Sequence, residues 1–177
     1  MLAAIVIMVM NSEKVPEMFA LIFRSAFGAE AAYGAIIGLA VVVALEDHPP
    51  GAWQTAVILV GTALAVGLAE VYSEAVGAEV RTRRRIAFGQ VRALAGEALA
   101  VAFGAGFPAF FFVAAALSAL SVESAFTLAR WSGLGLICFY GFVGARLSGA
   151  SMRRAVPEAL AVGAIGGILI ALKGLVH

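Results

Sequence analysis

The sequence predicts an all-α, polytopic integral membrane protein with about five transmembrane helices. Of its 177 residues, 63% are hydrophobic and only 13% are charged, and the mean hydropathy is +1.02. An average soluble domain is about 45–50% apolar and about 25% charged. A chain of 18.2 kDa is too small to bury so much apolar surface in one core. The charged residues also gather between apolar runs, and a membrane helix needs about 20 such residues.

Five apolar runs give the predicted spans, and the charges between them set their limits. The first span ends at Glu46 and Asp47, which Pro49 and Pro50 follow. The third contains Pro108, and the fifth has a charged residue near each end, where a long side chain can reach the interface. The predicted spans are, in order, residues 28–45, 53–77, 98–122, 127–148 and 155–176.

The residues before the first span form a separate prediction. Met1–Met10 is apolar but too short to cross a membrane, and no basic leader precedes it. We expect residues 1–27 to form an interfacial or loosely packed segment, with a sixth crossing as the alternative. Residues 28–177 are then a single five-helix transmembrane domain.

The distribution of cations predicts the orientation. With five spans, twelve Lys and Arg residues divide into ten on the N-terminal side of the first helix and two, Arg130 and Lys173, on the opposite side. Positive charge marks the cytoplasmic side of membrane proteins. We therefore expect a multi-pass cell-membrane protein with a cytoplasmic N-terminus and an outside C-terminus. The ten cations are Lys14, Arg24, Arg81, Arg83, Arg84, Arg85, Arg92, Arg146, Arg153 and Arg154.

Several classes of function find no support in the residues. The net charge of +1 gives no field that would recruit nucleic acid. One cysteine, Cys138, rules out a disulfide framework within the chain, and two histidines cannot build a His-based metal cluster. No phosphate loop or nucleophile with its base is present. We therefore expect no enzyme and no cofactor, and the bilayer itself is the first expected partner.

Pairs of small residues predict close helix packing. Gly34 and Gly38 are spaced as GxxxG, as are Gly163 and Gly167, and Ala63 with Gly67 forms a similar pair. Such pairs let helix backbones approach closely in lipid. They fit either packing within one subunit or the seam of a homodimer.

The candidate functional residues are Glu70 and Glu74. They lie four residues apart and so share one face of the second span, with Glu70 about 10 Å inside a boundary near Gly77 at about 1.5 Å per residue. Ionisable residues at such depth usually face a cavity or a partner. Two carboxylates offer ligands for a divalent cation, or a proton-exchange site. The alternative is that both reach the interface or pair with Arg81 and its neighbours.

Residues 33–177 resemble the vacuolar iron transporter family. The matching stretches are Gly67-Leu-Ala-Glu-Val-Tyr-Ser73, Leu134–Ser148, and the glycine-rich last helix after Arg153-Arg154. The resemblance implies a five-helix dimeric exporter of ferrous iron or manganese, coupled to protons, with Glu70 as a transport carboxylate. Tyr33 stands where that family has an aspartate, and its cytoplasmic insert is reduced here to about Glu79–Glu97.

Residues 1–39 resemble an internal segment of sodium:alanine symporters. The resemblance lies in Asn11-Ser-Glu-Lys-Val-Pro16, in Leu21-Ile-Phe-Arg-Ser-Ala-Phe27 and in Gly34–Gly38. Those symporters are much longer chains, so we interpret this stretch as a fused or misassigned start. Three hypotheses of function follow: a small divalent-cation transporter, a non-transporting membrane protein that serves assembly or partner binding, and a fragment related to amino-acid:sodium symporters.

Overall fold

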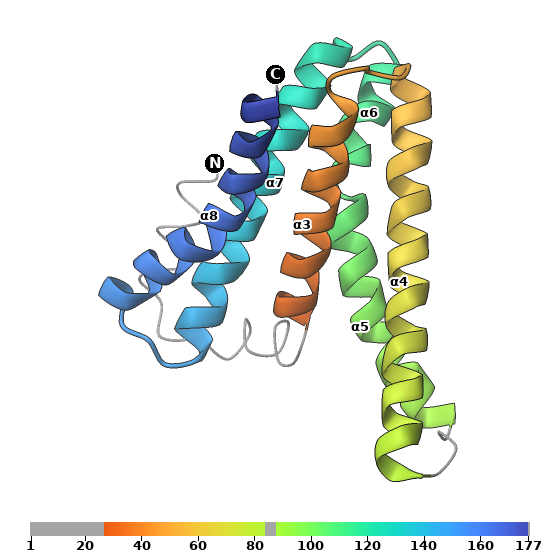
Figure 1. Ribbon diagram of the computed structural model, residues 1–177, viewed down its shortest axis with the longest axis vertical. Coiled ribbons are helices and arrows are strands. Elements are labelled where there is room, and N and C mark those ends of the chain that lie inside the picture. The colour runs from red at the N-terminus through yellow and green to blue at the C-terminus, as the bar shows by residue number, and fades with distance from the viewer. Residues whose placement is uncertain (1–26, 84–87, 177) are drawn as a thin grey trace.

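The computed structural model describes residues 27–83 and 88–176, and every regular element in these two ranges is a helix (Figure 1). With the labels of Figure 1, the helices are α3 (Phe27–Leu45), α4 (Ala52–Thr82), α5 (Phe88–Gly106), α6 (Ala109–Ala116), α7 (Val122–Leu147) and α8 (Met152–Val176). The predicted interfacial segment, residues 1–27, lies outside the described residues apart from Phe27.

The all-α membrane fold that the sequence predicts is confirmed. Four described helices, α3, α4, α7 and α8, are long and apolar enough to cross a membrane, and the bent pair α5–α6 makes a fifth if it is one span. Two tryptophans support the assignment of these helices to a membrane. Trp53 and Trp131, at one end of the bundle, are 65% and 60% exposed. Such residues are enriched at membrane interfaces. The chain is therefore a multi-pass membrane protein.

The third span differs from its prediction. The sequence predicted one helix over residues 98–122, but α5 starts at Phe88 and the helix bends by 50° between Gly106 and Ala109. The bend falls at Pro108, which has no N–H to donate and whose ring would collide with the carbonyl four residues back. The amides after the break bond three residues back, with Phe110 N–H donating to the Phe107 carbonyl at 3.2 Å. The expectation of one continuous helix was therefore wrong.

Helix α3 lies at the centre of the bundle, between α5 on one side and α7 on the other. Helix α4 packs outside α5 and α8 outside α7, so that α4 and α8 form the two edges (Figure 1). Near the end of α3 the core combines alanines with large side chains, and the Phe112 and Phe126 rings pack edge to face with their centroids 4.7 Å apart. Near its start the core is mostly alanine, with Tyr140 against Ala31 and Ala100.

Glycines set the register between α3 and α5, which run in parallel. A side-chain carbon at Gly34 would collide with the carbonyl oxygen of Val101, and one at Gly38 would lie 2.6 Å from the carbonyl oxygen of Ala105. From the other helix, Gly104 sits against the carbonyl oxygen of Ala31. The two backbones are therefore in direct contact, and steps of four residues on α3 match steps of four on α5.

The small-residue pairs pack within one chain. Gly34 and Gly38 face α5, Gly67 faces Ala98 and Ala102 of α5, and Gly163 sits against Cys138 of α7. A side-chain carbon added at Gly167 would have no neighbour within 4 Å among the described residues. Packing within the subunit thus accounts for most of the small-residue pairs. These pairs therefore give no support to a homodimer, which remains a prediction.

Candidate functional site

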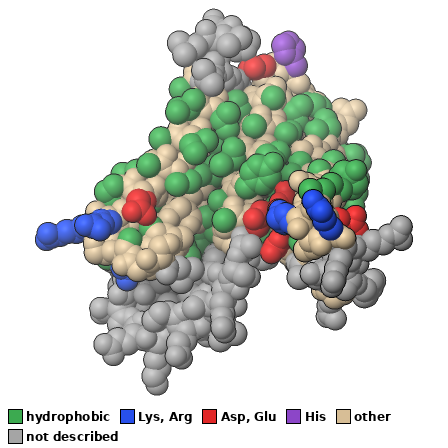
Figure 2. Space-filling model, turned by 60° about the horizontal axis from the view of Figure 1, so that its bottom comes forward, with side chains coloured by type: hydrophobic (Ala, Val, Ile, Leu, Met, Phe, Trp, Pro, Cys, Tyr) green, Lys and Arg blue, Asp and Glu red, His purple; other side chains and the backbone are tan. Residues whose placement is uncertain are grey.

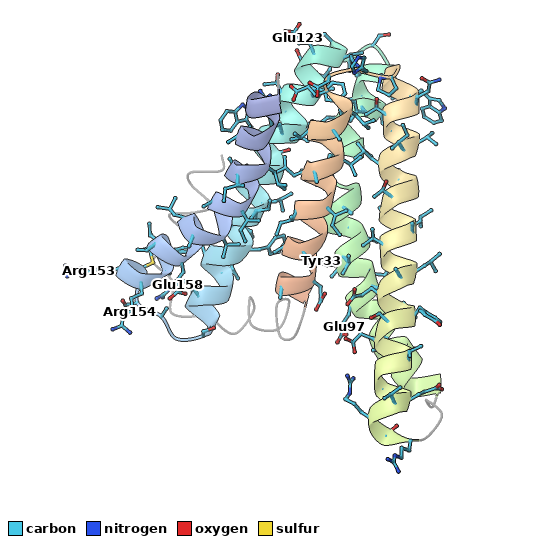
Figure 3. The ribbon with its side chains drawn as sticks, in the orientation of Figure 1. Tyr33, Glu97, Glu123, Arg153, Arg154 and Glu158 are labelled. Atoms are coloured by element: carbon cyan, nitrogen blue, oxygen red, sulfur yellow. The ribbon has the colours of Figure 1, made fainter. Side chains whose placement is uncertain are left out.

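Four glutamates from three helices lie at the end of the bundle where α3 begins. Glu30 is in the first turn of α3, Glu70 and Glu74 are on α4, and Glu97 is on α5. All four are partly buried, whereas Glu79, Glu123 and Glu158 are exposed. The carboxylate of Glu30 interacts electrostatically with those of Glu70, Glu97 and Glu74. We call this end the acidic end; acidic side chains gather there in Figure 2, and Glu97 is labelled in Figure 3.

The glycine register explains why Glu30 and Glu97 lie at the same level of α3 and α5. Gly34 packs against Val101 and Gly38 against Ala105. When this register is continued by one turn toward the N-terminal ends of the two helices, Glu30 lies opposite Glu97. The position of Glu30 is also favourable, because the helix dipole stabilises a negative charge in the first turn of a helix. The close approach of the two backbones therefore brings two like charges to the same level of the bundle.

Helix α4 adds its pair from the other side of α5. It runs antiparallel to α5, with Gly67 against Ala98 and Ala102. Glu70 and Glu74 follow Gly67 by about one and two turns, which places them level with the first half of α5 around Glu97. The shared face that the sequence predicted for Glu70 and Glu74 therefore points to the same region as Glu30 and Glu97.

One cation reaches this cluster in the described part of the chain. A guanidinium nitrogen of Arg81 lies 3.6 Å from a carboxylate oxygen of Glu74, and both side chains are well exposed, at 68% and 43%. This is the alternative that the sequence left open for Glu74. An exposed ion pair contributes at most about 1 kcal/mol. Among the described residues, the four carboxylates of this cluster therefore have one guanidinium partner, and it is loosely held.

Two tyrosines lie at different positions relative to this cluster. Tyr140 of α7 is buried against Ala31 and Ala100, each close in sequence to a glutamate of the acidic end. Tyr33, at the position of the family aspartate, is 49% exposed on α3 (Figure 3). The phenol of Tyr140 therefore borders the cluster, while Tyr33 turns a large part of its surface outward.

The cluster is not a ready-made metal centre. In residues 27–83 and 88–176, no three His, Cys, Asp or Glu side chains are close enough together to hold a metal ion. The glutamates act on one another through space, and what they can do chemically is to attract a cation or to share protons. The metal-ligand role of Glu70 and Glu74 therefore remains a prediction.

Glu30 and Glu97 are site residues that the sequence reasoning did not identify. Each precedes a small or apolar residue of the α3–α5 contact by one turn: Gly34 follows Glu30 and Val101 follows Glu97. The GxxxG pair of α3 was visible in the sequence, but its partner helix was not. The pairing of the two helices therefore had to be seen before the two carboxylates could be connected.

Comparison with known proteins places part of the chain beside a class of transporters. The model of the sodium:alanine symporter family matches residues 1–46, about a quarter of the chain. The match ends just after α3, so Glu30 falls within it, and Glu70, Glu74 and Glu97 fall outside it. The expected resemblance to symporters at the start of the chain is confirmed.

A particular relative gives the same result. The chain is 56% identical over 39 residues to the sodium/proton-dependent alanine carrier protein of Bacillus sp. (strain PS3). That match covers 22% of this chain and 9% of the relative, so the chain spans less than a tenth of that protein. No solved structure matches the chain. The resemblance of residues 33–177 to vacuolar iron transporters gains no support from these matches.

Proposed function

We propose that this protein is a small multi-pass membrane transporter that binds a cation at its acidic end. The observation that carries the proposal is the register of α3, α4 and α5, which gathers Glu30, Glu70, Glu74 and Glu97 while Arg81 alone pairs with them in the described residues. Like charges held together in a partly buried place repel one another. A bound cation or proton would remove that repulsion, and the site would therefore attract one.

The finer hypothesis is ferrous iron or manganese, exchanged against protons. It rests on the resemblance of Gly67–Ser73 to the second-helix segment of vacuolar iron transporters, with Glu70 as the transport carboxylate. Carboxylate oxygens are hard ligands, which suit such ions. Because the described residues hold no preassembled three-residue ligand group, this hypothesis requires weak, partly hydrated binding. Weak binding suits an ion that must leave again.

A second candidate is cation-coupled transport of an amino acid, alone or as part of a larger assembly. The observation that favours it is the match of residues 1–46 to the sodium:alanine symporter family. The matched stretch includes Glu30, so a sodium ion or a proton at the acidic end would serve this candidate as well. The two candidates differ in the ion that the acidic end binds and in the solute that moves.

The test is ion uptake into proteoliposomes that contain the purified full chain. Uptake of Mn²⁺, Fe²⁺ and Na⁺ is measured with and without a proton gradient, and alanine uptake is measured in parallel. Glu70→Gln keeps the shape of the side chain and removes its charge. We expect it to weaken cation uptake about tenfold or more, because about 1.4 kcal/mol of lost attraction is a factor of ten. Glu74→Gln should matter less, because Glu74 is already paired with Arg81.

The matched control is Glu123→Gln. Glu123 is an exposed glutamate in the first turn of α7, at the opposite end of the bundle, so its substitution removes the same charge elsewhere (Figure 3). Equal uptake by the wild type and Glu70→Gln would contradict the role of the acidic end. No uptake of any ion by the wild type would favour a non-transporting role in assembly or partner binding.

The proposed orientation places the acidic end in the cytoplasm. It is tested by single cysteines introduced in a Cys138→Ala background. A reagent that cannot cross the membrane should label position 50 from outside and should not label position 83, which follows α4 at the acidic end. Labelling of position 83 from outside would overturn the orientation.

A further inference from the structure

The first turn of α8 carries two arginines and no acidic residue. Arg153 and Arg154 are both exposed, and Figure 3 shows them pointing away from the bundle. Neither takes part in an ion pair with the described residues, although the exposed Glu158 lies one turn beyond Arg154. Positive charge at the start of a helix is opposed by the helix dipole. These two cations are therefore free to meet an anion from outside the described chain.

A third arginine stands on the other side of the α7–α8 turn. Arg146 is in the last turn of α7, and its Nη1 donates a hydrogen bond of 2.8 Å to the carbonyl oxygen of Ala150. This bond holds the guanidinium next to the turn that leads into α8. The turn is thus flanked by cations on both of the helices that it joins.

Apolar side chains continue from these cations along α8. Met152, Val156 and Leu160 follow one another at intervals of four residues, which places them on one face of the helix, and they are 37%, 48% and 64% exposed. Met152 directly precedes Arg153 and Arg154, and the apolar membrane window of α8 starts at the same residue. Helix α8 is also an edge of the bundle, so this face has no helix covering it among the described elements (Figure 1).

We propose that the start of α8 binds an anionic phospholipid. The phosphate of its headgroup would contact Arg153, which the helical repeat places beside this strip, with Arg154 and Arg146 as further cations at the same end, and its acyl chain would lie along Met152, Val156 and Leu160. Charge complementarity selects this occupant: cations lie beside an apolar strip at the end of a membrane-spanning window, which is the complement of a negatively charged amphiphile. This site is separate from the acidic end and does not depend on the transport proposal.

The test is a lipid titration of the purified full chain in a non-ionic detergent. Binding of short-chain phosphatidylglycerol, phosphatidylcholine and inorganic phosphate is measured, together with the melting temperature. We expect tight binding and a raised melting temperature with phosphatidylglycerol only. The double variant Arg153→Gln/Arg154→Gln should weaken phosphatidylglycerol binding about tenfold or more, since a cation near the membrane surface contributes about 1 kcal/mol toward anionic lipid.

The matched control is Arg81→Gln/Arg83→Gln, which removes two cations from the end of α4 at the same end of the bundle. It should bind phosphatidylglycerol within about twofold of the wild type. Both double variants should melt near the wild type without lipid. Equal loss of binding in the two variants would overturn the site, because the effect would then follow total charge. Equal binding of phosphatidylcholine, or of inorganic phosphate, would overturn the choice of an anionic lipid.

Discussion

The two ends of the helix bundle handle their charges in opposite ways. Where α3 ends, Nη1 of Arg130 donates hydrogen bonds to both carboxylate oxygens of Glu46, at 2.9 and 3.1 Å, and joins α3 to α7. Where α3 begins, the described residues place four glutamates in one region, and Arg81 pairs with one of them, Glu74, at 3.6 Å. The Glu46–Arg130 pair is balanced and cross-links two helices, whereas in the described residues one of the four clustered glutamates, Glu74, has an arginine partner. A paired arginine and glutamate need no further partner, whereas the proposal above assigns a bound cation to the glutamate cluster.

The two ends of the bundle also differ in how their helices pack. The core near Glu46 and Arg130 contains interlocking large side chains, including Phe112 and Phe126. The core near the acidic end is made of Ala31 and Ala100 around Tyr140, and the helices approach there through glycine. Large side chains fix the first end by volume. The second end depends on the direct contact of two backbones, which any added carbon would disturb.

The largest expected effect comes from Gly34→Val. A side chain at this position meets the backbone carbonyl of Val101, which cannot move aside as a side chain could. We expect the free energy of unfolding to fall by about 3 kcal/mol, at the upper end of the usual cost of overpacking. The measurement is denaturant unfolding in mixed micelles.

The control for Gly34→Val is Gly61→Val, at an exposed glycine of α4 where an added side-chain carbon would meet nothing within 4 Å among the described residues. A loss of stability that is equal in the two variants would show that helix propensity, and not the α3–α5 contact, is responsible. Such a result would also remove the basis for pairing Glu30 with Glu97.

The next largest effect should come from Glu46→Gln. The pair is about three-quarters buried, with 26% and 21% of the Arg130 and Glu46 side chains exposed, and Nε of Arg130 is already buried without a partner among the described residues. Breaking a fully buried pair costs about 3–5 kcal/mol, so for this partly exposed pair we expect about 2 kcal/mol. Thermal and denaturant unfolding both measure it.

A double variant makes this prediction sharper. Glu46→Leu together with Arg130→Leu removes both charges and leaves neither unpaired, so it should unfold close to the wild type. A double variant that is as unstable as Glu46→Gln would mean that the side chains matter for their packing and not for their charge.

The smallest expected effect has the opposite sign. Glu97→Gln at the acidic end removes one of four repelling charges and should raise the free energy of unfolding by about 0.5 kcal/mol. The same chemical change thus destabilises one end and stabilises the other. Destabilisation by Glu97→Gln in the absence of added cations would show that the glutamates are already compensated, and it would weaken the comparison on which the transport proposal rests.

The sequence by itself determined the class of the protein and most of its spans. Apolar runs of membrane length predicted α3, α4, α7 and α8 to within a few residues at most limits, because the cost of placing charge in hydrocarbon is local and can be read residue by residue. The same local signal missed the break in the third span, since hydropathy continues through Pro108 while helical hydrogen bonding does not.

Only the tertiary structure decided which carboxylates belong together. The spacing of Glu70 and Glu74 on one helix was visible from the helical repeat, and so were the glycines that allow close packing. Hydropathy does not say which helix a glycine face will meet, because lipid is as apolar as a helix and the choice depends on the fit of two surfaces. The fit of Gly34 and Gly38 against Val101 and Ala105 brought Glu30 to Glu97 and gave the acidic end its charge.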